Sequence, residues 1–174
     1  MLEVLKEQVV AAAKEADRLG MCKHKSGNFS IYDPETGYAV ITPSGVSRDV
    51  LTAKHICVMD LDGKVIERQE DLKPSSEAMM HLYIYKERKD ILAIVHTHAR
   101  YSTAFAIMNK PIPPIVYESA YLGKSGMVPV APYGRAGTVD LAWKVADVMK
   151  DHEVCLMESH GAIAAGSSLE DAFL

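Results

Sequence analysis

The first twenty residues of the chain follow the spacing of an amphipathic helix. Apolar side chains recur at three- and four-residue steps from Leu2 to Leu19, with charged residues between them, and Gly20 ends the pattern. This spacing gathers the apolar side chains into one stripe. We therefore expect a helix that packs one face against a core.

Short apolar runs separated by polar turns come next and predict strands. The predicted strands are Asn28–Ile31, Tyr38–Ile41, Ile56–Asp60 and Lys64–Glu67, with turns at 33–37 and 62–63. Proline and glycine at positions 43 and 45 interrupt regular structure, so residues 42–45 are expected to form a loop. A short helix is predicted at Arg48–Lys54.

One longer run, Ile91–His98, is mostly apolar and rich in β-branched residues, which is typical of a central strand buried on both faces. Before it, Ser75 or Ser76 can cap a helix that runs through Glu77 to Tyr85. The remaining predicted elements are helices at Tyr101–Met108 and Thr138–Met149, and strands at Ile115–Tyr117, Val128–Val130 and Val154–Met157.

The order of these elements predicts the fold class. Helices and strands are mixed without strict alternation, which favours a layered α/β domain whose sheet contains antiparallel pairs. A chain of 174 residues closes one core of ordinary size, so we expect a single domain over residues 1–174. Residues Ser167–Leu174 begin a helix and then stop, so we expect a C-terminal helix or tail to be missing from the sequence.

Composition excludes several classes of partner. The formal charge is −4, from 19 basic and 23 acidic residues, and no basic stripe suits a nucleic acid. No segment reaches the roughly 18 consecutive apolar residues of a membrane span, and charges interrupt the N-terminal apolar stretch. We expect a cytoplasmic protein that binds neither nucleic acid nor membrane. The three cysteines are widely spaced and are expected to be reduced thiols.

His96 and His98 are the first candidates for chemistry. They lie two residues apart at the end of the predicted central strand, so both imidazoles face the same side and can reach one ion. The alternative is a pair of hydrogen-bonded polar side chains at a strand end, and the pair by itself does not decide between the two.

His160 follows the predicted strand Val154–Met157 and precedes Gly161, which allows the backbone to approach a neighbour closely. Strand ends that are distant in sequence can converge in space, and three imidazoles leave an open position on a catalytic zinc ion. The alternatives are a hydrogen-bonded loop histidine at 160, and a different ligand pair formed by Glu77 and His81, one helical turn apart.

Three polar loops are candidates for binding a phosphate. They are Ser26-Gly27-Asn28, Thr42-Pro43-Ser44-Gly45 and Ser75-Ser76-Glu77, and each offers backbone N–H groups and side-chain donors. The third also opens a predicted helix, whose N-terminus favours an anion. Each loop alone could be an ordinary turn, and Glu77 could be a capping residue stabilised by the helix dipole.

Taken in order, the motifs Gly27-Asn28, Thr42-Pro43-Ser44-Gly45, Ser75-Ser76-Glu77, His96-Thr97-His98 and His160-Gly161 resemble those of the class II aldolase and adducin head family. The resemblance extends from the first helix to Leu174. It implies a three-layer αβα domain around a mixed, largely antiparallel central sheet. The members that cleave L-fuculose 1-phosphate are the nearest match.

The resemblance also implies site residues and a cofactor. One Zn²⁺ per subunit would be held by Glu77, His96, His98 and His160, and the substrate phosphate by Gly27, Asn28, Ser44, Gly45, Ser75 and Ser76. The metal would stabilise the enediolate formed when a ketose 1-phosphate splits into dihydroxyacetone phosphate and an aldehyde such as L-lactaldehyde. Glu77 would serve as the proton shuttle.

Further implications concern the assembly. The resemblance implies a homotetramer with sites at subunit interfaces, where Tyr117 would reach a neighbour's metal. From sequence alone, Tyr117 could equally be a tyrosine packed in the core. Where the fuculose-phosphate-cleaving members have a phenylalanine near the aldehyde, this chain has Tyr133-Gly-Arg135-Ala136-Gly137, which leaves the preferred aldehyde open.

Rival functions remain within the same family. Ribulose-5-phosphate 4-epimerases carry aspartate in place of Glu77, so glutamate favours the aldolase. Methylthioribulose-phosphate dehydratases have alanine after the first serine of the pair, whereas Ser75-Ser76 keeps both hydroxyls. A non-enzymatic, adducin-like interaction head is disfavoured because every ligand type is retained.

Overall fold

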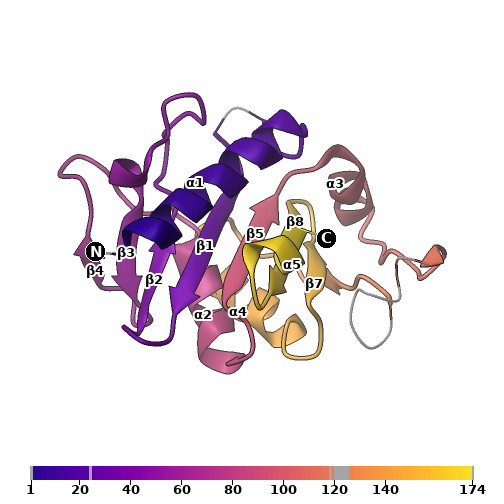
Figure 1. The fold of residues 1–174 in the computed structure, drawn as a ribbon. Helices are drawn as coiled ribbons and strands as arrows, with labels where there is room; N and C mark the ends of the chain where they lie inside the picture. Colours follow the sequence, from indigo (N-terminus) through magenta and orange to yellow (C-terminus); the bar gives the residue numbers. More distant parts are fainter. Residues whose placement is uncertain (1, 24, 118, 120–125, 174) are drawn as a thin grey trace.

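The computed structural model describes residues 2–23, 25–117, 119 and 126–173, and within them eight strands form one sheet (Figure 1). The strand order is β4-β3-β2-β1-β5-β8-β7-β6, and all neighbours are antiparallel except the parallel pair β6 and β7. The strands are β1 (Asn28–Asp33), β2 (Tyr38–Ile41), β3 (Cys57–Asp60), β4 (Val65–Glu67), β5 (Ala93–Thr97), β6 (Val130–Ala131), β7 (Val154–Met157) and β8 (Gly161–Gly166).

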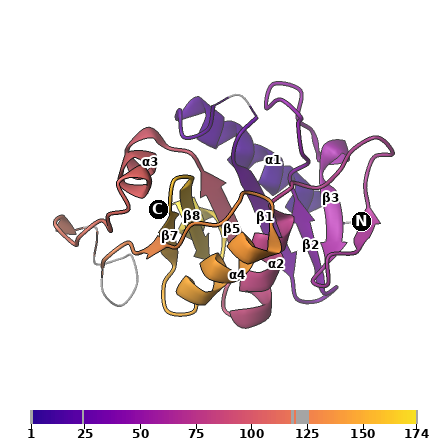
Figure 2. The same cartoon turned by 180° about the vertical axis from the view of Figure 1, so that it is seen from behind.

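Helices cover both faces of this sheet. They are α1 (Glu3–Arg18), α2 (Ala78–Glu87), α3 (Arg100–Ile107), α4 (Val139–Val148) and α5 (Leu169–Phe173), with a 3₁₀ turn at Ala53–His55. Helices α1 and α5 lie on the face turned to the viewer in Figure 1, and α2 and α4 lie on the face seen in Figure 2. Helix α3 packs beside β7 and β8. The predicted three-layer αβα domain with a largely antiparallel sheet is confirmed.

Alternation along the strands divides the interior into two cores. In β2, Ala39 and Ile41 pack toward α2 and α4, whereas Val40 packs toward α1. In β5, Val95 points to the α1 side, so His96 faces the α2 side. His96 is also the register partner of Asn28 on β1. The pleat thus brings the candidate residues of two central strands to one face, next to the start of α2.

Several predicted elements differ from the structure. Residues 115–117 form no strand but a bend leading into a 3₁₀ turn, with Ile115 77% exposed. The helix predicted at Arg48–Lys54 is replaced by turns, and the strand predicted at Val128–Val130 lies at Val130–Ala131. Strand β8 was not predicted at all. Leu174, the last residue of the predicted C-terminal helix start, lies outside the described residues.

Other predictions hold. The amphipathic N-terminal helix, the buried central strand β5 and the helix after Glu77 are present, each within a few residues of its predicted bounds. The three cysteines are free and buried, as expected. Among the described residues, no helix is both long and apolar enough to cross a membrane.

Candidate metal centre and active site

His96 is the most constrained of the three candidate histidines. It is fully buried near the end of β5, and its Nδ1 lies 2.8 Å from the carbonyl oxygen of Ala162 on β8. Because a carbonyl can only accept, Nδ1 carries a proton, and Nε2 is the ring nitrogen that faces the candidate site. A backbone acceptor on the far nitrogen is the usual way in which proteins orient a metal-binding imidazole.

His98 and His160 converge on this nitrogen. The Nε2 atoms of His98 and His96 are 3.0 Å apart, and one ligand atom from each of the three histidines lies within 4.8 Å of the others. The tight turn between β7 and β8 carries His160, with Ser159 in a left-handed conformation (φ 58°). The three histidines lie together, as expected from their places at two separate strand ends.

Glu77 lies against two of these imidazoles. It precedes the first residue of α2, and its two carboxylate oxygens lie 3.3 Å from Nε2 of His96 and 3.3 Å from Nε2 of His160. Asn28 also donates its Nδ2 to Glu77 at 2.9 Å. Burial raises the pKa of Glu77, but the His96 hydrogen bond, the charges of His96 and His160 and the Asn28 bond outweigh it and lower the pKa to about 2.

These residues fit a divalent cation. Two nitrogens bound to one tetrahedral zinc at about 2.0–2.1 Å lie roughly 3.3 Å apart, close to the 3.0 Å between Nε2 of His96 and Nε2 of His98. Burial, together with the charges of His96 and His160, lowers the pKa of His98 to about 4 and keeps it neutral, as a ligand must be. One buried oxygen of Glu77, Oε1, has no hydrogen-bond partner, which a cation would supply.

Backbone hydrogen bonds tie the predicted phosphate loops together. Phe29 N–H donates to Oγ1 of Thr42, and the N–H of Ser75 donates to the carbonyl of Thr42, each at 3.1 Å. Ser44 N–H donates to the carbonyl of Lys73 at 2.8 Å. Ser75 also accepts the N–H of Glu77 at its Oγ, 3.2 Å away. The three loops are therefore joined to one another, two of them contact Glu77 directly through Asn28 and Ser75, and Ser44, Gly45 and Ser76 are exposed.

Gly27 packs too tightly for any side chain. Its φ is +77°, and a Cβ there would come within 2.5 Å of Cys22 Sγ and 2.7 Å of the His96 carbonyl. The buried guanidinium of Arg48 holds the same loop by donating to the carbonyls of Ser26, at 3.1 Å, and Gly27, at 2.8 Å. The role of Arg48 was not predicted, because no local pattern shows which loop an arginine will reach.

The segment that departs from the family pattern lies next to these loops. Gly137 is so near Ser76 that a Cβ would come within 3.2 Å of the Ser76 carbonyl. At the other end of the segment, Tyr133 N–H donates to the carboxylate of Glu158 at 2.9 Å, two residues before His160. Residues 133–137 therefore extend from the histidine turn to the serine pair, along one side of the candidate site.

Two alternatives that the sequence left open are excluded by the fold. Tyr117 is 79% exposed, so it is not a core tyrosine. His81 is fully buried and hydrogen-bonds Asn28 and Ser30 instead of joining the histidine group. The Glu77–His81 ligand pair is therefore not formed. The regular spacing of Glu77, His81 and Tyr85 was the available signal for a buried polar row.

In this α/β domain, three imidazoles at strand ends meet one carboxylate at the start of α2. Such a set of side chains is typical of enzymes that use a metal ion. Comparison with known proteins narrows this class. The chain belongs to the family described as Class II Aldolase and Adducin N-terminal domain, whose sequence model matches residues 7–174.

Individual relatives agree with this assignment. A 5-deoxy-D-ribulose 1-phosphate aldolase from Bacillus thuringiensis serovar kurstaki is 36% identical over 173 residues, which are 99% of this chain and 79% of that protein. An L-fuculose phosphate aldolase from Escherichia coli O6:H1 is 38% identical over 168 residues, 97% of this chain and 75% of that protein. A solved L-fuculose 1-phosphate aldolase, 36% identical, superposes with a TM-score of 0.92 over 98% of this chain and 78% of its own. The chain is an aldehyde-lyase of this family.

Proposed function

We propose that the protein is a zinc-dependent aldolase that cleaves a ketose 1-phosphate, L-fuculose 1-phosphate or a close analogue, to dihydroxyacetone phosphate and an aldehyde such as L-lactaldehyde. The observation that carries this proposal is the contact of Glu77 with both His96 and His160, at 3.3 Å each, next to the three tied polar loops. It sets one carboxylate between a candidate cation site and a candidate phosphate site.

The proposed reaction breaks the bond between C3 and C4 of the sugar. The hydroxyl on C4 loses its proton and becomes the aldehyde, while C3 gains a proton and becomes the hydroxymethyl group of dihydroxyacetone phosphate. A bound cation would polarise the C2 ketone and stabilise the negative charge that develops on cleavage. His96, His98 and His160 are the proposed neutral ligands, with Glu77 as a fourth before substrate binds.

Glu77 is the proposed proton carrier at C3. The contacts that lower its pKa are those with His96, His160 and Asn28, whereas its burial acts in the opposite direction. A carboxylate that moved off the imidazoles would keep the burial and lose much of the lowering. Its proton affinity would then rise toward the range in which a side chain can take and return a proton.

The phosphate is proposed to bind at Gly27, Asn28, Ser44, Gly45, Ser75 and Ser76. The exposed Ser44 and Ser76 and the start of α2 all favour an anion there. Gly27 and Gly45 both have positive φ, which turns consecutive N–H groups toward a common side.

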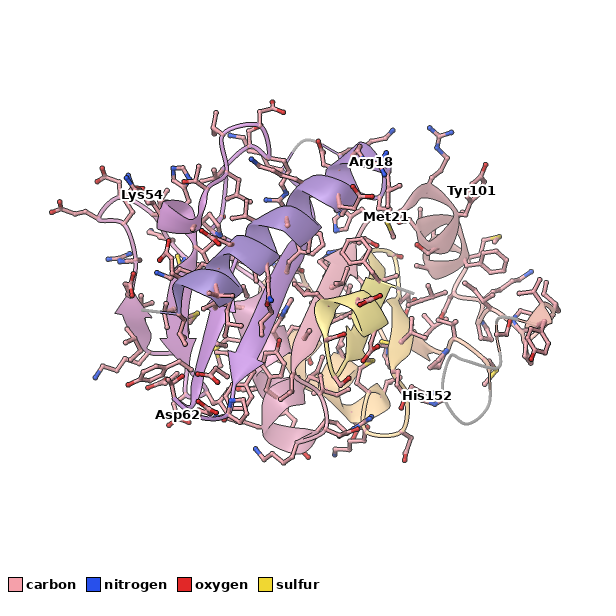
Figure 3. The ribbon with its side chains drawn as sticks, in the orientation of Figure 1. Arg18, Met21, Lys54, Asp62, Tyr101 and His152 are labelled. Carbon is pink, nitrogen blue, oxygen red and sulfur yellow. The ribbon has the colours of Figure 1, made fainter. Side chains whose placement is uncertain are left out.

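The active form is proposed to be a homotetramer in which Tyr117 reaches the metal site of a neighbouring copy. Large apolar side chains are exposed along α3 and the segment after it, among them Tyr101, Ile107, Ile115 and Val116, between 59% and 81% exposed. Figure 3 shows Tyr101 pointing outward from α3. Large apolar side chains exposed in number are common where proteins associate. Tyr117 lies in the same segment, where its phenol could exchange a proton with the C4 oxygen of a neighbour's substrate.

A second substrate is favoured by one comparison. The Bacillus thuringiensis relative acts, by its name, on 5-deoxy-D-ribulose 1-phosphate, which shares the phosphorylated C1–C3 end with L-fuculose 1-phosphate and differs at the aldehyde end. Residues 133–137, including Arg135, depart from the family pattern at that end. We therefore propose the deoxypentulose phosphate as the alternative substrate of the same reaction.

The experiment is a product assay with the zinc-loaded protein. L-fuculose 1-phosphate, 5-deoxy-D-ribulose 1-phosphate and L-ribulose 5-phosphate are supplied separately, and released dihydroxyacetone phosphate is measured together with zinc content. We expect the triose phosphate from the first or second sugar. Conversion of L-ribulose 5-phosphate to its epimer, without triose phosphate from any sugar, would replace the aldolase by the epimerase. No zinc and no turnover would leave only an interaction module.

A further inference from the structure

A row of buried polar side chains leads away from Glu77 into the interface between α2 and β1. Asn28 donates Nδ2 to Glu77 at 2.9 Å, and its Oδ1 lies 2.5 Å from Nε2 of His81. Nδ1 of His81 lies 2.7 Å from the hydroxyl of Ser30, which lies 2.6 Å from the hydroxyl of Tyr85. All five side chains are buried, and apart from Oε1 of Glu77 none of their polar atoms lacks a partner.

The polar side chains of α2 and β1 meet at the same levels, because both elements advance by a similar distance from one polar residue to the next. Glu77, His81 and Tyr85 are spaced four residues apart along the helix, a rise of about 6 Å per step. Asn28 and Ser30 are spaced two apart on the strand, a rise of about 6.8 Å. One helical stripe therefore meets one face of β1, and each helix residue finds a strand partner at its own level. Tyr32 continues the strand side by stacking on Tyr85, with ring centroids 5.4 Å apart.

While Glu77 is charged, the hydrogen bonds of this row can point in only one direction. A carboxylate accepts, so Asn28 must present its NH₂ to Glu77 and its carbonyl oxygen to His81. Nε2 of His81 must then donate. Burial lowers the pKa of His81 to about 3, so the ring is neutral and Nδ1 accepts from Ser30, which accepts from Tyr85. The row thus runs from the Tyr85 hydroxyl to the Glu77 carboxylate without an unpaired group.

We propose that His81 is a positioning residue for Glu77, acting through the Asn28 amide; this inference rests on the proposed function of Glu77. The two ends of an amide have nearly the same shape, so packing alone cannot decide which end faces the carboxylate. Glu77 attracts the NH₂ end, and His81 holds the amide in that orientation, because its Nε2–H donates to the amide oxygen and cannot pair with the NH₂ group. Without His81, the buried amide oxygen loses its partner, so the amide can turn away from Glu77, and the carboxylate loses the hydrogen bond that helps to hold it between His96 and His160.

The test is a double-mutant cycle on the zinc-loaded full chain. The variants are His81→Leu, Glu77→Gln and the two combined, with turnover measured at saturating ketose phosphate. We expect His81→Leu to lower kcat by about 10- to 100-fold, the range typical of partners that orient metal-site residues. In the Glu77→Gln background the same change should lower kcat less than threefold, because the group on which His81 acts is already gone.

Two conservative variants separate positioning from packing. His81→Gln keeps an N–H near the position of Nε2 and should recover most of the kcat lost in His81→Leu. Tyr85→Phe removes only the last hydroxyl of the row and should lower kcat severalfold. Tyr32→Phe is the matched control, since it removes a tyrosine hydroxyl from the neighbouring ring outside the row and should leave kcat unchanged. Melting temperature and zinc content are measured for every variant.

One readout needs no turnover. In the unmodified protein, ¹⁵N spectra of labelled histidine should show His81 as the neutral tautomer protonated at Nε2, and Ser30→Ala should perturb its Nδ1 signal. A tautomer protonated at Nδ1 would overturn the inference. So would an equal loss from His81→Leu in both backgrounds, or full kcat in His81→Leu with zinc bound. Normal turnover of Glu77→Gln alone would instead refute the proposed function and not the geometry of the row.

Discussion

Gly161 lies directly against the carbonyl of Thr97. A Cβ on Gly161 would stand 2.5 Å from that oxygen, 3.1 Å from Cδ2 of His98 and 3.3 Å from Cε1 of His96. The turn that carries His160 can therefore close onto the end of β5 only because the next residue has no side chain. A contact between two backbones, and not a side-chain interaction, sets how near the third histidine comes to the other two.

The first prediction follows from this contact. Gly161→Ala forces the turn away from β5, so we expect a loss of ~1–3 kcal/mol in the free energy of unfolding, together with weakened zinc binding. Gly20→Ala is the control, because Gly20 has φ +70° but nothing within 4 Å, so only backbone strain of about 1 kcal/mol is added. Titration with zinc and thermal melts would distinguish the two variants. Unchanged zinc affinity in Gly161→Ala would show that the turn tolerates displacement.

The second prediction concerns the metal. The His96→Ala, His98→Ala double variant should lose bound zinc and activity together while keeping its circular dichroism spectrum, because most of the two cores lies away from the site. In the unmodified protein, zinc at 100 times its dissociation constant should stabilise the fold by about 2.7 kcal/mol, an effect that chelation removes. Metal analysis checks the first part, and full zinc occupancy in the double variant would mean that the ligands lie elsewhere.

The third prediction separates two roles of Glu77. As a capping residue alone, its replacement by Gln would cost about 1 kcal/mol or less and leave turnover nearly intact. As the proton carrier, Glu77→Gln should lose about 10²–10⁴-fold in turnover with zinc still held by the histidines. We expect the second result. Turnover, zinc content and melting temperature are measured on the same preparation, and near-normal turnover with zinc bound would remove the proton role.

The fourth prediction tests whether sites are shared between subunits. Tyr117→Phe and the His96→Ala, His98→Ala variant should each be inactive or nearly so as pure assemblies. Mixed after partial dissociation, they should regain activity, because some sites then combine intact histidines with a neighbour's intact Tyr117. Light scattering follows assembly, and Ile115→Glu, which places a charge beside Tyr117, should shift it toward monomers. An active monomer, or no recovery in well-mixed assemblies, would contradict shared sites.

The fifth prediction is a pH dependence away from the metal. The hydrogen bond from Arg88 lowers the pKa of Asp90 to about 2, and Arg88 also donates to the carbonyl of Met149 at 2.9 Å, joining the ends of α2 and α4. A lowered carboxyl pKa contributes stability above the unfolded value, roughly 3.9, which is lost as the pH falls toward 2. Asp90→Asn should therefore be modestly less stable than the unmodified chain at pH 6, and the difference should shrink through this window. A difference that stays constant from pH 6 to 2.5 would mean that the carboxyl is not coupled to Arg88.

Most of the fold was predictable because its signals are local. The stripe of α1, the short runs on either side of the turn at 33–37, and the β-branched run of β5 are each visible within a few neighbouring residues. Strand β8 was missed because its sequence, Gly161-Ala-Ile-Ala-Ala-Gly166, consists mainly of residues that seldom favour strands. Its place is set by its neighbours in the sheet, since β5 and β7 both pair with it.

The wrong strand at Ile115–Tyr117 fails for the opposite reason. Its apolar, β-branched residues have the composition of a buried strand, but the structure leaves them exposed. Composition alone does not distinguish an apolar segment buried in the core from one that lies exposed on the surface. The histidine positions were predictable from spacing at strand ends. The Asn28–His81 bond was not, because it depends on which helix face meets which strand.

The strand order has a consequence for how the protein folds during synthesis. In the sheet, β5 lies between β1, some sixty residues earlier in the chain, and β8, the last strand in the sequence. Pairings between distant segments close slowly, because a long loop must be ordered before its contacts form. A growing chain can assemble α1 to β5 with only two histidines in place. Zinc capture should therefore be a late event that coincides with the docking of the β7–β8 hairpin, and metal shortage should leave a nearly complete sheet whose final strands open most easily.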